Sequence, residues 1–340
     1  MSTFTFEGTE NRMRWDRRSQ GFIEVWYCTL NHGPTGAGVW IRYTITSPDA
    51  GNGDPYCELW GAFFDPEGKK SFVVKETYPI DRLGAPNGRD DGALVRIGSA
   101  WLSETHLDGE ISSGDHSMRW SLDMEPASST FQHLPPRLRA RAERKAAALC
   151  SPNLSVPFDG AVEIDGETIE MRRDIGCQSH RWGRGNVETW AWAHCGRFDG
   201  TDAVFEGVAG RSKIGPFPAP TTTLLYLRYQ GMDLTFNDVR GVIRARGRYE
   251  MPRWAFTAHD GEWKIAGAAR AMPERMLQVT YVDPDASKRF CANSEIADLG
   301  IEVYQMSSAG WRHHGSLTAL GTAHIEFGRR DPFVELPVSL

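Results

Sequence analysis

The sequence lacks several features that would assign it at once to a functional class. No run of about 18 apolar residues occurs in the 340-residue chain, so we expect no membrane-spanning helix. The 38 basic residues are outnumbered by 44 acidic ones, and the net charge of −6 argues against nucleic-acid binding, which needs a basic surface. The stretch MSTFTFEGTENRMRW has no basic cluster followed by an apolar segment, so we expect no signal peptide.

Cysteine is sparse and scattered. The six cysteines lie far apart, without a C-x-x-C pair, and no nucleophile-elbow motif is present. Because the chain is long and shows no signal peptide, we expect reduced thiols and a cytoplasmic location. Helical periodicity is also rare, and consecutive strand-like segments with short turns favour antiparallel sheets.

The chain is instead rich in strand-forming sequence. Segments of β-branched and aromatic residues recur throughout, at 22–30, 38–46, 71–78, 93–102, 117–124, 160–173, 188–195, 203–210, 221–238, 262–271, 275–283, 301–306 and 322–328. Hairpin turns are expected at Asp165-Gly166 and at Gln230-Gly231.

One segment of good helix formers interrupts the strands. It predicts two β-rich domains: an N-terminal domain at 1–133, a connecting helix or linker at 134–152, and a C-terminal domain at 153–340.

The densest group of uncommon residues is GCQSHRWGRGNVETWAWAHC, residues 176–195, with three tryptophans, two histidines and two cysteines. Side chains alternate along a strand, so one face of the predicted strand carries a carboxylate, two indoles and an imidazole, from Glu188, Trp190, Trp192 and His194. That face fits the lining of an apolar cavity with polar groups at its edge. A packed core face explains the same pattern, and a structural or interaction protein would follow if no cavity exists.

Three chemistries compete for this stretch. A metal site would use Cys177, His180, His194 and Cys195, but the spacing is unusual for zinc, and adjacent His194 and Cys195 point to opposite faces of a strand. A nucleophilic Cys177 or Cys195 with His180 lacks any recognisable signature. Acid–base chemistry by His180 and a carboxylate in an aromatic pocket uses what the stretch contains, so we expect no metal.

At these residues the sequence resembles the hydroxyneurosporene synthase (carotenoid 1,2-hydratase) and AttH-like family, with tocopherol cyclases and lipocalin-like Diels–Alderases as more distant kin. H-x-W-G followed by a W-x-W strand is the most specific part. The resemblance covers most of the chain, in FIEVWYCTLNHGPTGAGVWIRYTIT, MRWSLDMEP, SPNLSVPFDGAVEIDGETIEM, GCQSHRWG, ETWAWAHCGRFDG, FCANSEIA and GTAHIEFG.

This resemblance implies an all-β fold of two tandem lipocalin-like antiparallel β-barrel domains joined by a short helix. It implies chemistry without metal or organic cofactor, on an apolar substrate in a cavity between or within the barrels. His180 and Trp182 match the H-x-W motif of the hydratases. Phe205 and Glu206 stand where those enzymes have a tyrosine and an aspartate, a departure that weakens carotenoid hydration as the activity.

The sequence therefore favours a lyase or isomerase of the hydratase or cyclase type, acting on a terpenoid- or polyketide-like molecule of secondary metabolism. The candidate catalytic residues are His180, Glu206, Glu188 and His194, and the candidate substrate-binding residues are Trp182, Trp190, Trp192, Phe205 and Trp26. The alternative is a non-catalytic carrier of an apolar ligand, because a lipocalin-like fold does not fix a function. The substrate and the oligomeric state stay open.

Overall fold

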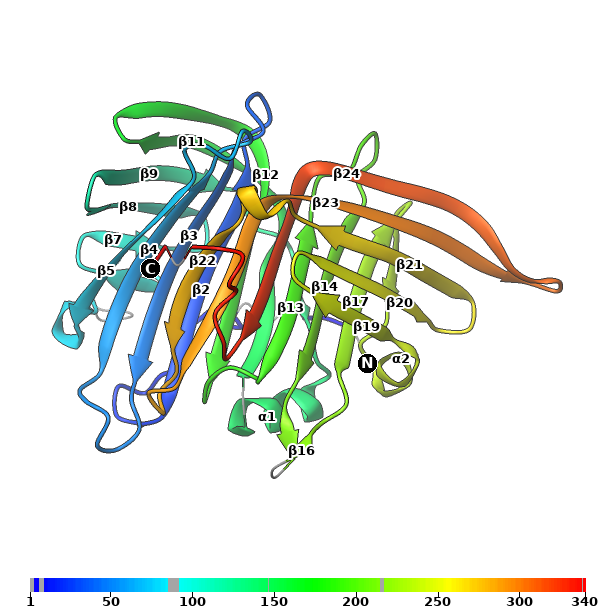
Figure 1. The fold of residues 1–340 in the computed structure, drawn as a ribbon, viewed down its shortest axis with the longest axis horizontal. Coiled ribbons are helices and arrows are strands. Elements are labelled where there is room, and N and C mark those ends of the chain that lie inside the picture. Colours follow the sequence, from blue (N-terminus) through cyan, green and yellow to red (C-terminus); the bar gives the residue numbers. More distant parts are fainter. Residues whose placement is uncertain (1–2, 6–8, 85–91, 146, 215–216, 338) are drawn as a thin grey trace.

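The computed structural model describes residues 3–5, 9–84, 92–145, 147–214, 217–337 and 339–340. Most of these residues are in strands, which form two large curved antiparallel sheets lying side by side (Figure 1). The predicted all-β fold of two lipocalin-like units is confirmed. None of the helices in the described ranges is long and apolar enough to cross a membrane.

The first sheet is built from the N-terminal half of the chain. Its strands are β1 (Phe4–Thr5), β2 (Phe22–Asn31), β3 (Gly38–Ser47), β4 (Tyr56–Phe64), β5 (Phe72–Pro79), β6 (Val95–Ile97), β7 (Ala100–Leu102), β8 (His106–Ser113), β9 (His116–Met124), β10 (Thr130–Gln132), β11 (Ala147–Ile164) and β12 (Glu167–Gly183). Their order is β5-β4-β3-β2-β12-β11-β9-β8-β7-β6, and β10 joins β1 to β11. The short helix η1 (Ile80–Arg82) follows β5.

The second sheet follows directly in sequence. Its strands are β13 (Thr189–Cys195), β14 (Val204–Arg211), β17 (Thr222–Tyr229), β18 (Met232–Thr235), β19 (Arg246–Glu250), β20 (Arg253–His259), β21 (Trp263–Arg270), β22 (Leu277–Val282), β23 (Lys288–Ser307) and β24 (Gly310–Arg329). They lie in the order β18-β17-β14-β13-β24-β23-β21-β20-β19, with β22 on β23. The remaining elements are β15 (Lys213–Ile214), β16 (Phe217–Pro218), α1 (Pro136–Lys145), α2 (Val239–Arg244) and η2 (Pro273–Arg275).

The change from one sheet to the other differs from the predicted division at 152/153. Helix α1 ends at Lys145, and the hairpin of β11 and β12 pairs with β9 and β2 of the first sheet. Residues 147–150 favour a helix by propensity, but long-range pairing, such as Ala148 with Trp182, places them in a strand. We therefore propose a first unit that ends at Gly183 and a second unit that begins at Thr189.

Each unit has its own apolar core, and a third cluster joins them. Trp26 and Trp120 lie in the core of the first unit, and Trp254 lies in that of the second. The third cluster takes Trp60 from β4 and Tyr281 from β22, whose rings meet edge to face at 5.8 Å. The interface between the two units is therefore itself a packed apolar core.

Candidate functional site

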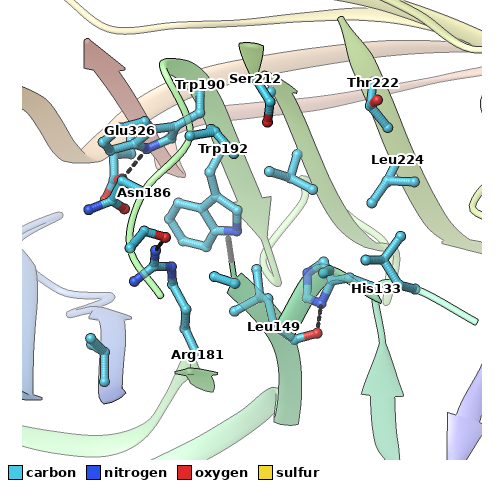
Figure 2. Close-up of a pocket in the computed structure, with 18 of the residues that line it drawn as sticks. His133, Leu149, Arg181, Asn186, Trp190, Trp192, Ser212, Thr222, Leu224 and Glu326 are labelled. Atoms are coloured by element: carbon cyan, nitrogen blue, oxygen red, sulfur yellow. Dashed lines mark hydrogen bonds between the residues drawn. The ribbon is translucent and has the colours of Figure 1, made fainter. Parts of the chain in front are cut away.

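A cavity of about 640 Å³ lies at the interface between the two units. This volume falls within the range of small-molecule sites, roughly 300–1,000 Å³. Strands of both sheets and helices α1 and α2 contribute to its wall. Figure 2 labels His133, Leu149, Arg181, Asn186, Trp190, Trp192, Ser212, Thr222, Leu224 and Glu326 in this wall. Most of the lining is apolar, so the cavity suits a largely apolar molecule.

Strand β13 places its two indoles in the cavity wall (Figure 2). Trp190 and Trp192 face the cavity, whereas Ala191, Ala193 and Cys195 face the core of the second unit. This is the two-faced strand that the period-two pattern predicts. The tryptophan face thus points outward from its own unit and toward the first unit.

A histidine and a carboxylate share a proton in this wall. Nδ1 of His133 donates to the carbonyl oxygen of Leu149 at 3.1 Å, because a carbonyl can only accept. Nε2 of His133 lies 2.6 Å from Oε1 of the buried Glu206, so a second proton lies between these two atoms on one partner or the other. Nε1 of Trp192 also donates to that oxygen, at 2.7 Å.

The other oxygen of Glu206, Oε2, has no hydrogen-bond partner among the described residues. The pair of His133 and Glu206 has the chemistry to give up and take back a proton, and its histidine lines an apolar cavity.

Two further carboxyl groups line the cavity. Oε1 of Glu326, on β24, accepts a hydrogen bond from Nε1 of Trp190. Burial, and then the nearby charge of Glu326, raise the pKa of Glu295 on β23 well above its usual range. Both oxygens of Glu295 lack a hydrogen-bond partner in the described part of the chain. Such unsatisfied buried groups are rare and mark functional sites.

Two arginines from the first unit line the same cavity. The guanidinium of Arg42, on β3, lies over the ring of Tyr281 at 4.1 Å. Arg181, on β12, donates to the carbonyl oxygen of Gly185 at 2.6 Å, and burial lowers the pKa of its guanidinium. The cavity therefore pairs an apolar lining with a few buried charges of both signs.

The structure separates His180 from this cavity. Adjacent residues of β12 point to opposite sides, and it is Arg181 that lines the cavity. His180 is buried on the other side, stacked on Trp26 at 4.5 Å and tilted against Trp182 at 4.8 Å. Its Nε2 lies 2.8 Å from Oε1 of Glu24. The predicted residues His180, Trp26 and Trp182 thus form a group within the first unit.

The group around His180 fastens the N-terminal segment to β2 and β12. Nδ1 of His180 donates to the carbonyl oxygen of Glu10 at 2.9 Å. The carboxylate of Glu24 accepts from the backbone N–H groups of Arg14 and Trp15 at 2.7 and 2.9 Å. These contacts satisfy every member of the group within the first unit, so a structural role explains them.

The other predicted residues divide among three places. Glu188 forms a two-pronged ion pair with Arg330 at 2.6 and 2.7 Å in an exposed setting and does not line the cavity. Phe205 stacks on Phe256 at 4.8 Å in the core of the second unit. His194 is buried at the interface, with Nδ1 3.2 Å from Nδ1 of His324. Of the predicted catalytic residues, the structure brings Glu206 and His194 closest to the tryptophan face.

Sequence reasoning missed His133, Glu295 and Glu326 as site residues. His133 falls at the predicted domain edge, and nothing in its neighbourhood marks it. Glu295 and Glu326 lie in FCANSEIA and GTAHIEFG, two of the segments that carry the family resemblance. Acidic residues within those apolar strands were the available signal, because a carboxylate flanked by buried strand residues is seldom left without a role.

Comparisons with known proteins agree with this fold. Two uncharacterized proteins from Mycobacterium tuberculosis strains, CDC 1551 and H37Rv, are each 27% identical over 321 residues, spanning 93% of this chain and 89% of theirs. The crystal structure of a candidate AttH from Nitrosomonas europaea shares the fold, with a TM-score of 0.52, 15% identity, and coverage of 91% of this chain and 93% of that one. The family model for tocopherol cyclase-like proteins matches residues 103–328. The chain belongs to the tocopherol cyclase-like family.

Proposed function

We propose that this protein is an acid–base enzyme that cyclises, hydrates or isomerises an apolar, terpenoid- or polyketide-like molecule without an organic cofactor. The observation that carries the proposal is the proton shared by His133 and Glu206 in the wall of an apolar cavity. The name of the family, tocopherol cyclase-like, adds support for the cyclase type.

The geometry supports a simple sequence of proton transfers. A carbon–carbon double bond of the substrate takes the proton from the pair of His133 and Glu206, which leaves a cation on the neighbouring carbon. The indole faces of Trp190 and Trp192 stabilise that cation. A phenol or water oxygen then bonds to the cationic carbon and returns its proton to the pair. One C–H and one C–O bond form, the π bond of the alkene and one O–H bond break, and the enzyme regains its starting state.

Isomerisation follows from the same cation. Loss of a proton from an adjacent carbon back to the pair forms a new double bond at a shifted position and restores the starting state of the enzyme. The choice among the three outcomes depends on what the cavity holds next to the cationic carbon. A phenol oxygen beside that carbon gives a ring, and a water oxygen gives an alcohol. Where no such oxygen lies beside it, the cation loses a proton and gives an isomer.

The test is the fate of prenylated hydroquinones and polyprenyl alcohols that are incubated with the protein and analysed by liquid chromatography and mass spectrometry. Cyclisation or isomerisation gives a product of unchanged mass and new retention time, and hydration adds the mass of one water. Glu188→Gln is the matched control, because this carboxylate lies in an exposed ion pair outside the cavity wall. It should convert substrate at the wild-type rate.

The second candidate is a carrier, which the apolar cavity between two lipocalin-like units favours. A carrier would retain the same molecules with measurable affinity and return them unchanged. Binding without conversion of any member of the panel would contradict the enzyme and support the carrier.

We also propose a cytoplasmic location. All six cysteines are unpaired and buried, as expected for a protein of a reducing compartment. Intact-mass measurement of the protein isolated from its native host should find six free thiols and no disulfide.

A further inference from the structure

Three side chains with ligand atoms for metals meet at the interface between the units. Cys177 comes from β12, His194 from β13 and His324 from β24. The cysteine sulfur and the ring nitrogens lie within 4.8 Å of one another, and all three residues are fully buried. Trp192, in the cavity wall, stacks on both imidazoles at 6.2 and 6.4 Å. The cluster thus lies next to the cavity.

The hydrogen bonds fix which nitrogen of each imidazole carries the proton. Nε2 of His194 donates to the carbonyl oxygen of Leu154 at 2.7 Å. Nε2 of His324 donates to Oδ1 of Asn31 at 2.9 Å. The orientation of that amide is set because Nδ2 of Asn31 donates to the carbonyl oxygen of Glu295 at 2.6 Å. In the neutral imidazoles, both Nδ1 atoms therefore present lone pairs.

These two lone pairs face each other. The Nδ1 atoms of His194 and His324 are 3.2 Å apart, a close approach for two lone pairs, and the hydroxyl of Thr29 lies 2.8 Å from Nδ1 of His324. Two nitrogens bound to one tetrahedral zinc at 2.0–2.1 Å are separated by about 3.3 Å, so the observed spacing fits a shared metal. Metal-bound histidines also commonly donate their second N–H to a carbonyl or amide oxygen, as both do here.

Glu295 offers a carboxylate beside these three residues. Its carboxylate is fully buried, neither oxygen has a hydrogen-bond partner in the described part of the chain, and Oε2 lies 3.6 Å from Nδ1 of His324. A thiolate and a carboxylate together balance the charge of a divalent cation, which leaves a neutral buried site. The hydroxyl of Thr29 lies 2.8 Å from Nδ1 of His324 and 3.1 Å from the sulfur of Cys177, so a metal bound to that nitrogen would free its one proton to donate to the thiolate.

We propose that Cys177, His194, His324 and Glu295 bind one zinc ion at the interface between the two units. The set of one sulfur, two imidazoles and one carboxylate suits zinc and disfavours magnesium and calcium, which prefer oxygen ligands. Glu295 also lines the cavity, so the ion would lie in its wall and join both sheets. The inference goes beyond the proposed function and needs no substrate to test.

The first measurement is the metal content of the full-length protein produced in zinc-supplemented medium and exchanged into buffer with a mild chelator. The wild type should carry about one zinc per chain, and Cys177→Ser and His324→Ala should each lose most of it. Cys195→Ser is the matched control, because this buried cysteine lies on the opposite face of β13 and should leave the zinc in place. Circular dichroism confirms that each variant is folded.

A second measurement keeps the proposal testable if the variants fail to fold. Wild-type protein refolded with Co²⁺ should show thiolate-to-cobalt charge transfer and the visible bands of a tetrahedral site. Protein that holds neither zinc nor cobalt would overturn the site. Zinc that is retained equally in Cys177→Ser, or cobalt without a sulfur band, would mean adventitious binding and would overturn it as well. An intense thiolate-to-copper band in the isolated protein would keep the ligands and overturn the assignment to zinc.

Discussion

At the scale of single residues, two of the buried histidine–glutamate pairs in the described chain share one hydrogen-bond pattern but have different surroundings. His133 with Glu206 and His180 with Glu24 are both buried histidine–glutamate pairs in which Nδ1 donates to a backbone carbonyl. Only His133 lines the cavity. The pair of His133 and Glu206 can exchange a proton with a ligand because it reaches the cavity. The pair of His180 and Glu24 is enclosed and holds the N-terminal segment in place.

Removal of the imidazole from the pair of His180 and Glu24 should destabilise the protein. His180→Ala leaves the buried carboxylate of Glu24 without its imidazole, so the free energy of unfolding should fall by about 3 kcal/mol. Urea denaturation measures the change. His313→Ala, which removes an exposed histidine 2.6 Å from Glu302, is the control and should change stability by at most about 0.5 kcal/mol. Equal effects of the two substitutions would contradict the structural role of His180.

Buried thiols give a prediction with a pH dependence. Burial raises the pKa of Cys150 and of Cys195 to about 12, so both thiols stay almost wholly protonated, and poorly reactive, at pH 8.5. Native protein treated with iodoacetamide at pH 8.5 should show no modification of these two residues by intact-mass and peptide analysis. The same treatment in denaturant should modify both. Rapid labelling of either thiol in the native protein would contradict their burial.

At this scale the sequence predicted site residues whose placement depends on local spacing, and it missed those that only the fold brings together. The alternation within β13 was enough to place Trp190 and Trp192 on one face. His133 and Glu206 are 73 residues apart, and only the contact between the units brings them together. His324 escaped notice for the same reason, since its partner His194 lies 130 residues away.

At the scale of elements, β24 shapes the cavity wall through a residue without a side chain. A Cβ at Gly328 would lie 2.1–2.2 Å from ring atoms of Trp190, closer than atoms can approach. The indole therefore lies flat against the backbone of β24, and the same strand supplies Glu326 to its N–H group. Two residues of β24 therefore fix the position of Trp190: Gly328 leaves room for the indole, and Glu326 accepts its hydrogen bond.

Gly328→Ala should displace that indole. We expect a loss of about 1–3 kcal/mol in the free energy of unfolding and weaker binding of any apolar ligand, because the displaced ring must enter the cavity. Gly300→Ala on β23 is the control, since nothing lies within 4 Å of the added Cβ. Denaturation curves and tryptophan fluorescence measure both. A Gly328→Ala protein with wild-type stability and spectrum would show that the wall is looser than the contacts indicate.

Strand segments were largely predictable, and their pairing was not. Composition located β2, β3 and β5 within a residue or two and set the turns at Asp165 and Gln230, both of which have positive φ. It missed β4, β8 and β20, where glycines and charged residues dilute the apolar pattern. It also extended a helix into β11, because helix propensity is local whereas the pairing of β11 with β12 is not.

At the scale of the whole molecule, the two units make so many contacts across their interface that we expect them to fold and unfold together. Oγ1 of Thr29 lies 2.8 Å from Nδ1 of His324, and Asn31 donates to the backbone of Glu295. Gly38 packs so closely against Glu295 that an added Cβ would lie 2.6 Å from its side chain. The cavity exists only where the two sheets meet, so the function we propose belongs to the pair of units.

This interface predicts a single unfolding transition. Far-ultraviolet circular dichroism and tryptophan fluorescence should give coincident melting curves, because unfolding of one unit would expose the apolar surface that the other unit packs against it. Bound zinc should raise the melting temperature of the whole transition, since its four ligands come from both units. Two separated transitions would contradict the shared core.

The central claim is that the pair of His133 and Glu206 protonates an apolar molecule in the cavity between the units. The most direct measurement is the deuterium content of prenylated substrate recovered from incubation in D₂O with wild-type protein and with Glu206→Gln. The wild type should introduce carbon-bound deuterium, and Glu206→Gln should do so at least about a hundredfold more slowly, the usual size of a lost general acid. Equal incorporation by the two proteins, or none by the wild type while it binds the same molecule, would contradict the claim.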